Sequence, residues 1–167
     1  MSELPDVERL LSGMAERLTE YLRRHERRDP LMIGIRTGGV WVAERLQGLL
    51  GLPGPLGTLN INFYRDDFTR IGLHPRIAPS DLPFEVDGRH IVLVDDVLYT
   101  GRTIRAALNE IFDYGRPASV TLGTLVERDG RELPIQADVL GQHVRLEANE
   151  SIKLTGPEPL ALEVRRG

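Results

Sequence analysis

The chain has 167 residues, a formal net charge of −4 and no cysteine, and 41% of its residues are hydrophobic. This length is typical of one domain, and the lack of cysteine excludes disulfides, cysteine zinc sites and thiol nucleophiles. The negative net charge argues against a protein held to nucleic acid mainly by bulk charge. No apolar run reaches the ~18 residues of a membrane span, and the first residues do not resemble a secretion signal, so we expect a cytoplasmic protein.

The first part of the chain is predicted to alternate helices and strands. Apolar residues recur at helical spacing from Val7 to Arg28, and Asp29–Pro30 ends this helix. Short apolar runs predict strands at Leu31 to Ile35 and Leu59 to Tyr64, with a helix from about Val40 to Leu50 between them.

The segment from Arg65 to Gly88 is rich in glycine, proline and aspartate and has no clear period. A connection of this length is usually functional, and it leaves room for an antiparallel ribbon. The elements expected after it are a buried strand at His90 to Val94, a helix at Arg102 to Tyr114, a strand at Ser119 to Val126, and short strands at Ala137 to Leu140 and Leu160 to Val164. The apolar face predicted for the helix consists of Ile104, Ala107, Leu108, Ile111 and Phe112.

This order of elements predicts an α/β fold in which helices flank a mainly parallel central sheet, as a single domain over residues 1–167. In such sheets, ligands bind at the carboxyl ends of the strands. Two strand-to-helix turns carry unusual residues at that end.

The stronger of the two turns follows the strand at His90 to Val94. Asp95 and Asp96 come first, and Tyr99-Thr100-Gly101-Arg102-Thr103 opens the next helix. Alone, adjacent aspartates are typical of a solvated turn, and Thr-Gly-x-Thr is typical of helix capping. Together, in this context, they predict a phosphate at the helix N-terminus with two carboxylates nearby. Carboxylates suit vicinal hydroxyls or magnesium, and a phosphorylated ribose combines these groups.

The weaker turn is Arg36-Thr37-Gly38-Gly39, which follows the strand at Leu31 to Ile35. A Gly-Gly pair is often only a structural turn. Beside the first motif, its arginine fork and its small residues indicate a second phosphate site, of the pyrophosphate kind. Neither a Walker loop nor a dinucleotide fingerprint is present.

The segment from Val92 to Thr103 resembles the phosphoribosyl-pyrophosphate (PRPP) signature of type I phosphoribosyltransferases, and the form Val-Asp-Asp-Val-Leu-Tyr-Thr-Gly-Arg-Thr is similar to the PyrR family. Further similarity lies in Tyr64-Arg65-Asp66-Asp67, Gly115-Arg116-Pro117 and Arg131-Glu132-Leu133-Pro134-Ile135. The resemblance implies the type I phosphoribosyltransferase fold, with a small hood at about 131–167 and a long loop at about 65–88. It also implies the reaction of uracil with PRPP to UMP and pyrophosphate, and relatives that form dimers or larger assemblies.

The resemblance also implies roles for individual residues. Asp95 and Asp96 would hold the ribose hydroxyls and, directly or through water, the magnesium bound to PRPP. The 5′-phosphate would lie on Tyr99, Thr100, Gly101, Arg102 and Thr103, and the pyrophosphate on Arg36, Thr37, Gly38 and Gly39. Arg65, with His74 as a weaker candidate, would close over the site.

PyrR proteins also control pyrimidine genes by binding leader RNA in a UMP-dependent manner, and for this chain Ser12 and Arg131 are the candidate contacts. Gly13, Glu16, Gly130 and Gln136 stand where basic residues would be expected in RNA-binding members, so weak RNA binding is predicted. Two alternatives remain open from the sequence. One is a purine-type phosphoribosyltransferase, which Tyr99 disfavours because purine enzymes tend to carry aspartate there. The other is a sensor of PRPP or UMP without useful catalysis.

Overall fold

The computed structural model describes residues 4–61 and 80–167. The predicted lid residues Arg65 and His74 lie outside these ranges. The helices and strands are α1 (Val7–Arg24), β1 (Leu31–Ile35), α2 (Gly38–Leu50), β2 (Gly57–Leu59), β3 (His90–Leu98), α4 (Arg102–Tyr114), β4 (Ser119–Arg128), β5 (Val139–Val144), β6 (Glu150–Thr155) and β7 (Ala161–Arg166).

Five strands form one parallel sheet in the order β2-β1-β3-β4-β5, which confirms the predicted fold class. Strands β6 and β7 form a separate antiparallel hairpin. From β1 the chain builds the sheet outward to β2, whereas from β3 it builds in the opposite direction to β4 and β5. The point of reversal lies between β1 and β3, and ligands of open α/β sheets bind at the carboxyl ends of the strands at such a point.

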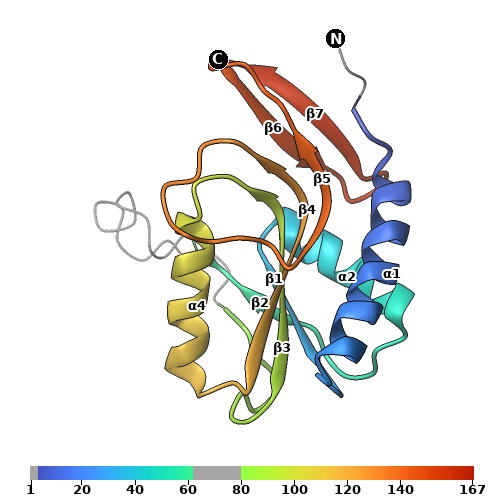
Figure 1. The fold of residues 1–167 in the computed structure, drawn as a ribbon, viewed down its shortest axis with the longest axis vertical. Helices are drawn as coiled ribbons and strands as arrows, with labels where there is room; N and C mark the ends of the chain where they lie inside the picture. The colour runs from blue at the N-terminus through green and yellow to red at the C-terminus, as the bar shows by residue number, and fades with distance from the viewer. Residues whose placement is uncertain (1–3, 62–79) are drawn as a thin grey trace.

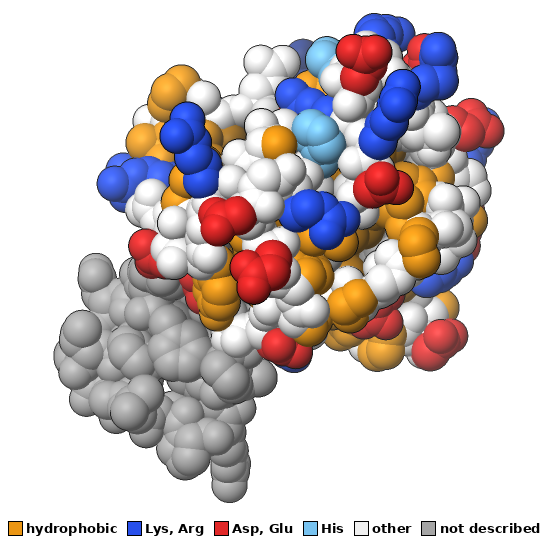
Figure 2. Space-filling model, turned by 90° about the horizontal axis from the view of Figure 1, so that it is seen from below, with side chains coloured by type: hydrophobic (Ala, Val, Ile, Leu, Met, Phe, Trp, Pro, Cys, Tyr) orange, Lys and Arg blue, Asp and Glu red, His pale blue; other side chains and the backbone are white. Residues whose placement is uncertain are grey.

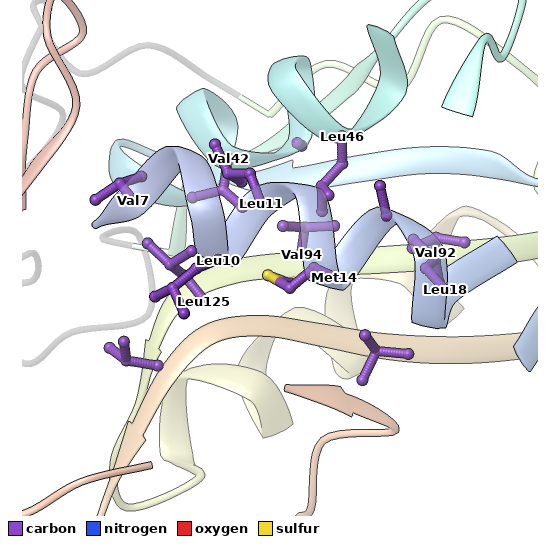
Figure 3. Packing of buried hydrophobic residues seen from close by; sticks show 14 of the residues in the cluster. Val7, Leu10, Leu11, Met14, Leu18, Val42, Leu46, Val92, Val94 and Leu125 are labelled. Carbon is purple, nitrogen blue, oxygen red and sulfur yellow. The ribbon is translucent and has the colours of Figure 1, made fainter. Parts of the chain in front are cut away.

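Helices cover both faces of the sheet, with α1 and α2 on one face and α4 on the other (Figure 1). The larger core joins α1, α2 and one face of β3, and Figure 3 shows Leu11, Met14 and Leu18 of α1 packing beside Val92 and Val94 of β3. The hairpin adds Ile152 and Leu154 to this core. The smaller core lies between the sheet and α4. The helices therefore hold the central strands from both sides.

Helix α1 ends at Arg24, four residues before the predicted end. Leu22 is its last buried residue, and the stretch that follows it offers no further apolar side chain to the core. Glu26 takes a left-handed backbone conformation with φ of 54°, which a helix does not continue. At the other end, the Asp6 carboxylate caps the helix by accepting a bond from the N–H of Arg9.

Of the strand predicted at Leu59 to Tyr64, residues 62–64 lie outside the described ranges, and the prediction is wrong at Asn60 and Ile61, which are not part of a strand. Strand β2 ends at Leu59, because the N–H of Asn60 donates to the Ser80 hydroxyl at 2.9 Å rather than continuing the ladder. Thr58 and Asp81 form an isolated antiparallel bridge, while most of the segment in which a ribbon was expected lies outside the described ranges.

The strand predicted at His90 to Val94 continues to Leu98, and the one predicted at Ser119 to Val126 continues to Arg128. Helix α4 has its predicted bounds, but Phe112 does not belong to its buried face and is 56% exposed. The side of α4 that the sheet covers follows Ile104, Ala107 and Ile111.

In the tail, β5 and β7 begin one or two residues later than predicted and end later, and β6 was not predicted. The six residues of β6 contain only two apolar side chains, which is a weak strand signal. None of the helices in the described ranges is long and apolar enough to cross a membrane.

Leu18 provides a test of the larger core, because its side chain is fully buried between α1 and the sheet. Leu18→Ala is expected to lower the free energy of unfolding by about 3 kcal/mol, measured by urea denaturation, since it leaves a cavity. Leu49→Ala is the matched control, because Leu49 is 50% exposed on α2 and should change stability by less than about 1 kcal/mol. Equal losses for both variants would contradict this packing.

Candidate active site

A cavity of about 430 Å³ opens at the carboxyl ends of β1 and β3, where the order of strands reverses. Three elements bound it: the β1–α2 turn, the end of β3 with the start of α4, and strand β6. Its lining consists of Ile35, Arg36, Thr37, Gly38, Trp41, Ile61, Asp95, Asp96, Val97, Thr103, Lys153 and Leu154.

Asp95 and Asp96 reach this cavity because the alternation of strand β3 breaks at these two residues. Val92 and Val94 belong to the larger core, and three residues further on Val97 also packs against it. Strict alternation along a strand would send residues an odd number apart to opposite faces. The change of phase allows two neighbouring carboxylates to line one cavity.

Each of the two carboxylates also holds the backbone that follows it. Asp95 Oδ1 accepts the N–H of Asp96 at 2.8 Å, and Asp96 Oδ1 accepts the N–H of Val97 at 2.9 Å. Asp95 is buried, and burial, followed by the neighbouring Asp96 carboxylate, raises its pKa well above the ordinary value. The site therefore holds one carboxyl group that resists ionisation.

The β1–α2 turn lies directly against these aspartates. A side chain at Gly38 would overlap the carboxylate of Asp96, and a Cβ at Gly39 would lie 2.8 Å from the carbonyl O of Val94 and 3.1 Å from Asp95 Oδ1. The sequence-based interpretation assigned these glycines to close approach of a phosphate. The structure adds a second reason for them, which is the close approach of the turn to β3.

Helices α2 and α4 begin at the site, and neither N-cap side chain caps its own helix, although the Thr100 hydroxyl accepts the N–H of Arg102 at 3.1 Å. Thr37 at the start of α2 and Gly101 at the start of α4 make no capping bond, whereas Asp6 caps α1, which begins elsewhere. The free N–H groups and the dipole of such a terminus favour an anion. The cavity thus lies between the first turns of two helices.

The loop Tyr99–Thr103 is held by the segment that follows β4. The N–H groups of Glu132 and Leu133 donate to the carbonyl O of Thr100 at 2.9 and 3.1 Å. Gly101 has φ of 96°, and a Cβ there would lie 3.1 Å from the side chain of Ile135. The loop is therefore clamped from outside while its helix end faces the cavity.

Arg131 is the centre of this clamp. Its guanidinium donates to the carbonyl O of Tyr99, to that of Ile135 at 2.9 Å and to the Glu127 carboxylate at 3.1 Å. Arg131, which was predicted to contact RNA, thus uses most of its hydrogen-bond donors for groups within the protein. Beside it, the Arg128 guanidinium stacks 4.1 Å from the centre of the Tyr99 ring.

The structure brings part of the predicted site to the cavity wall: Arg36, Thr37, Gly38, Asp95, Asp96 and Thr103 line it. Gly39 lies just behind, against Asp95. The Arg102 side chain lies outside the lining and pairs with Glu132 at 2.6 Å, so this residue offers the loop its backbone only. Ser12 lies on the exposed side of α1.

Sequence reasoning missed Trp41 and Lys153 among the lining residues. Trp41 follows the Gly-Gly pair by two residues, so its place in the first turn of α2 was a usable signal. Lys153 is the only lysine of the chain, but the sequence did not place its strand.

The resemblance of this site to the PRPP signature implies a magnesium ion. The cavity residues suit an ion that enters bound to the substrate. Within the described ranges, no group of three or more histidine, aspartate or glutamate side chains could hold a metal by itself. Magnesium is commonly bound by one or two carboxylates together with substrate phosphates and water. Asp95 and Asp96 can supply that share.

Comparison with known proteins identifies the family of the chain. The model of the phosphoribosyl transferase domain matches residues 2–156. A protein named "Bifunctional protein PyrR" from Nitrosococcus oceani is 63% identical over 162 residues, covering 96% of this chain and 92% of the relative. A protein of the same name from Pseudomonas entomophila is 61% identical, covering 96% and 93%.

Solved structures share the fold at lower identity. A hypoxanthine-guanine-xanthine phosphoribosyltransferase aligns with a TM-score of 0.62 at 23% identity, covering 86% of this chain and 79% of the other. The hypoxanthine phosphoribosyltransferase of Trypanosoma cruzi aligns with a TM-score of 0.63 at 20% identity, covering 83% and 77%.

The raised pKa of Asp95 predicts how Asp95→Asn changes stability with pH. Because the folded pKa exceeds the unfolded value of about 3.9, this carboxyl stabilises the fold at lower pH, and that contribution is lost as pH rises through the folded pKa. The asparagine does not ionise. The variant should therefore match the wild type near pH 3.5 and become the more stable of the two toward pH 7.

Urea denaturation without ligand at a series of pH values measures this difference. Asp113→Asn, at an exposed position on α4, controls for the loss of a carboxylate. A stability difference for Asp95→Asn that stays constant over the series would contradict the raised pKa.

Proposed function

Because the chain belongs to the phosphoribosyltransferase family, and within it to the PyrR proteins, we propose that it converts uracil and PRPP to UMP and pyrophosphate. The observation that carries the proposal is the arrangement around one cavity of two adjacent carboxylates and the N-termini of two helices. PRPP carries a 5′-phosphate and a pyrophosphate on either side of a ribose diol, so each of its groups has a partner in that arrangement.

In the proposed reaction, a ring nitrogen of uracil forms a bond to C1 of the ribose while the bond from C1 to pyrophosphate breaks, and the proton of that nitrogen is released to solvent. Negative charge develops on the departing pyrophosphate. Arg36 and the N-terminus of α2 lie where they stabilise that charge, since donors already in place act strongly in a site that excludes water. The attraction becomes stronger as negative charge develops on the pyrophosphate, so it stabilises the transition state more than the bound substrates.

The 5′-phosphate occupies the N-terminus of α4 in this proposal. Thr103 lines the cavity there, and the backbone of Thr100 and Gly101 is held by the 132–135 segment. A loop held in place beforehand loses little entropy when it binds, which improves both affinity and orientation.

Asp95 and Asp96 hold the ribose hydroxyls in this proposal, and the Asp96 carboxylate steadies the positive charge that forms at C1. The same two residues would hold the magnesium ion carried by PRPP, directly or through water, and that ion would neutralise charge on the pyrophosphate. No residue of the described cavity wall is an obvious general base. The transfer then depends mainly on charge stabilisation and on the position of uracil.

The identity of the PyrR relatives supports uracil as the base, whereas the structures of purine enzymes show likeness of fold alone. Tyr99 agrees with this preference, because its side chain is 46% exposed and stacks against Arg128 beside the phosphate loop. The base specificity is tested together with activity below.

The relatives are named bifunctional, and we also propose a regulatory function for this chain. In this proposal the chain binds pyrimidine leader RNA in a UMP-dependent manner, but only weakly. Ser12 is an exposed candidate contact, but Arg131 is engaged in the clamp and Glu16 repels phosphate. On the face seen in Figure 2, acidic side chains lie among the basic ones. A mixed surface of this kind favours weak binding.

The enzymatic proposal is tested by incubating the protein with PRPP, Mg²⁺ and a panel of bases. UMP should form from uracil, and no nucleotide should form from hypoxanthine or guanine. Asp95→Asn combined with Asp96→Asn should lower kcat/KM by at least about 100-fold without unfolding the protein, because the ribose contacts and their charge are lost.

Three outcomes would contradict parts of this proposal. Turnover of hypoxanthine but not of uracil would establish the purine alternative. Tight UMP binding without turnover at saturating PRPP would establish a sensor. Wild-type rates in the double variant would exclude the aspartates from the site.

The RNA proposal is tested by filter-binding titration of pyrimidine leader RNA with and without UMP, against an unrelated RNA of equal length. Binding is expected to be weak, in the micromolar range or above, and to fall steeply with salt. Nanomolar binding that UMP strengthens at physiological salt would show that this chain has a dedicated RNA surface.

A further inference from the structure

Strand β6 carries a cation to the cavity that lies outside both phosphate-binding turns. Lys153 lines the cavity together with Arg36, Thr37 and Gly38. Its neighbours Ile152 and Leu154 are both buried in the larger core. These two anchors fix the backbone of Lys153, so the position of its side chain beside the cavity is a property of the fold.

The hairpin is packed on the α2 side of the cavity. A Cβ at Gly156, just after β6, would lie 3.4 Å from the ring of Trp41. Trp41 stands in the first turn of α2, two residues after Gly39. Lys153 therefore approaches the cavity from the side of the β1–α2 turn, whereas the α4 loop contributes only Thr103 to the lining.

Within the described residues, Lys153 makes no ion pair. The residue opposite it on β7 is Glu163, and that carboxylate pairs with Arg165 at 3.0 Å. Arg36, on the same cavity, also has no ion pair within the described ranges. Asp96 lines the same cavity but forms an ion pair with neither cation in the described part of the chain, so both cations can attract a ligand that carries several negative charges.

We infer that Lys153 is a binding residue for the pyrophosphate group of PRPP, acting together with Arg36 of the β1–α2 turn. The inference rests on the proposed function and extends its pyrophosphate site to the C-terminal hairpin. A flexible ammonium group can follow the pyrophosphate as its charge increases, and so Lys153 stabilises the leaving group as well as bound PRPP.

The test compares Lys153→Met with Lys153→Arg and with Arg166→Met. Methionine keeps the apolar stem and removes the charge, and arginine keeps the charge. Arg166 is an exposed residue of the same hairpin outside the cavity lining, so its variant controls for lost charge on β6 and β7. Calorimetry measures the Kd of pyrophosphate with Mg²⁺, and initial rates measure KM for PRPP and for uracil.

Lys153→Met should weaken pyrophosphate binding and raise the KM for PRPP by about tenfold each, the loss typical of one charged hydrogen bond. The KM for uracil should stay unchanged, Lys153→Arg should recover most of the loss, and Arg166→Met should match the wild type. An unchanged pyrophosphate Kd in Lys153→Met overturns the inference. A wild type that binds pyrophosphate but forms no UMP contradicts the proposed function and leaves the binding comparison valid.

Discussion

The close approach of the β1–α2 turn to strand β3 is the constraint on which the site depends. Gly38 and Gly39 leave no side chain between this turn and the carboxylates of Asp96 and Asp95. The same contact places the start of α2 beside the start of α4, on either side of the point where the sheet reverses its order. A larger residue at either glycine would separate the turn from the strand, and the two helix starts would no longer share a cavity.

The C-terminal third of the chain supports this centre in two separate ways. The segment after β4 clamps the α4 loop through Arg131 and the carbonyl of Thr100, outside the cavity. The β6–β7 hairpin packs on the larger core and adds Lys153 to the cavity wall. The hood expected from the sequence as one unit thus contains one part that holds a loop and another that lines the cavity.

Much of the fold and part of the site could be predicted from local patterns. The bounds of β1 and α4 follow from uninterrupted apolar periodicity, and both signature turns were found because a motif occupies consecutive residues. Long-range contacts gave no such signal. Phe112 fits the helical period of α4, but no sheet surface reaches it. The donors of Arg131 are bound by groups up to 32 residues away, so its role in the clamp is invisible in its own segment.

The sequence by itself determined the α/β class, the family and the position of the two strand-to-helix turns at the site, because strand and helix periods and contiguous motifs are properties of neighbouring residues. Only the tertiary structure decided that Asp95 and Asp96 line one cavity, that Gly38 and Gly39 are needed against β3, and that Lys153 lines the same cavity as the β1–α2 turn. These facts depend on a change of phase within a strand and on packing between segments more than 100 residues apart, such as α2 and β6. Such contacts form only when the core brings the segments together, and so their physical cause lies in the packing rather than in any local pattern.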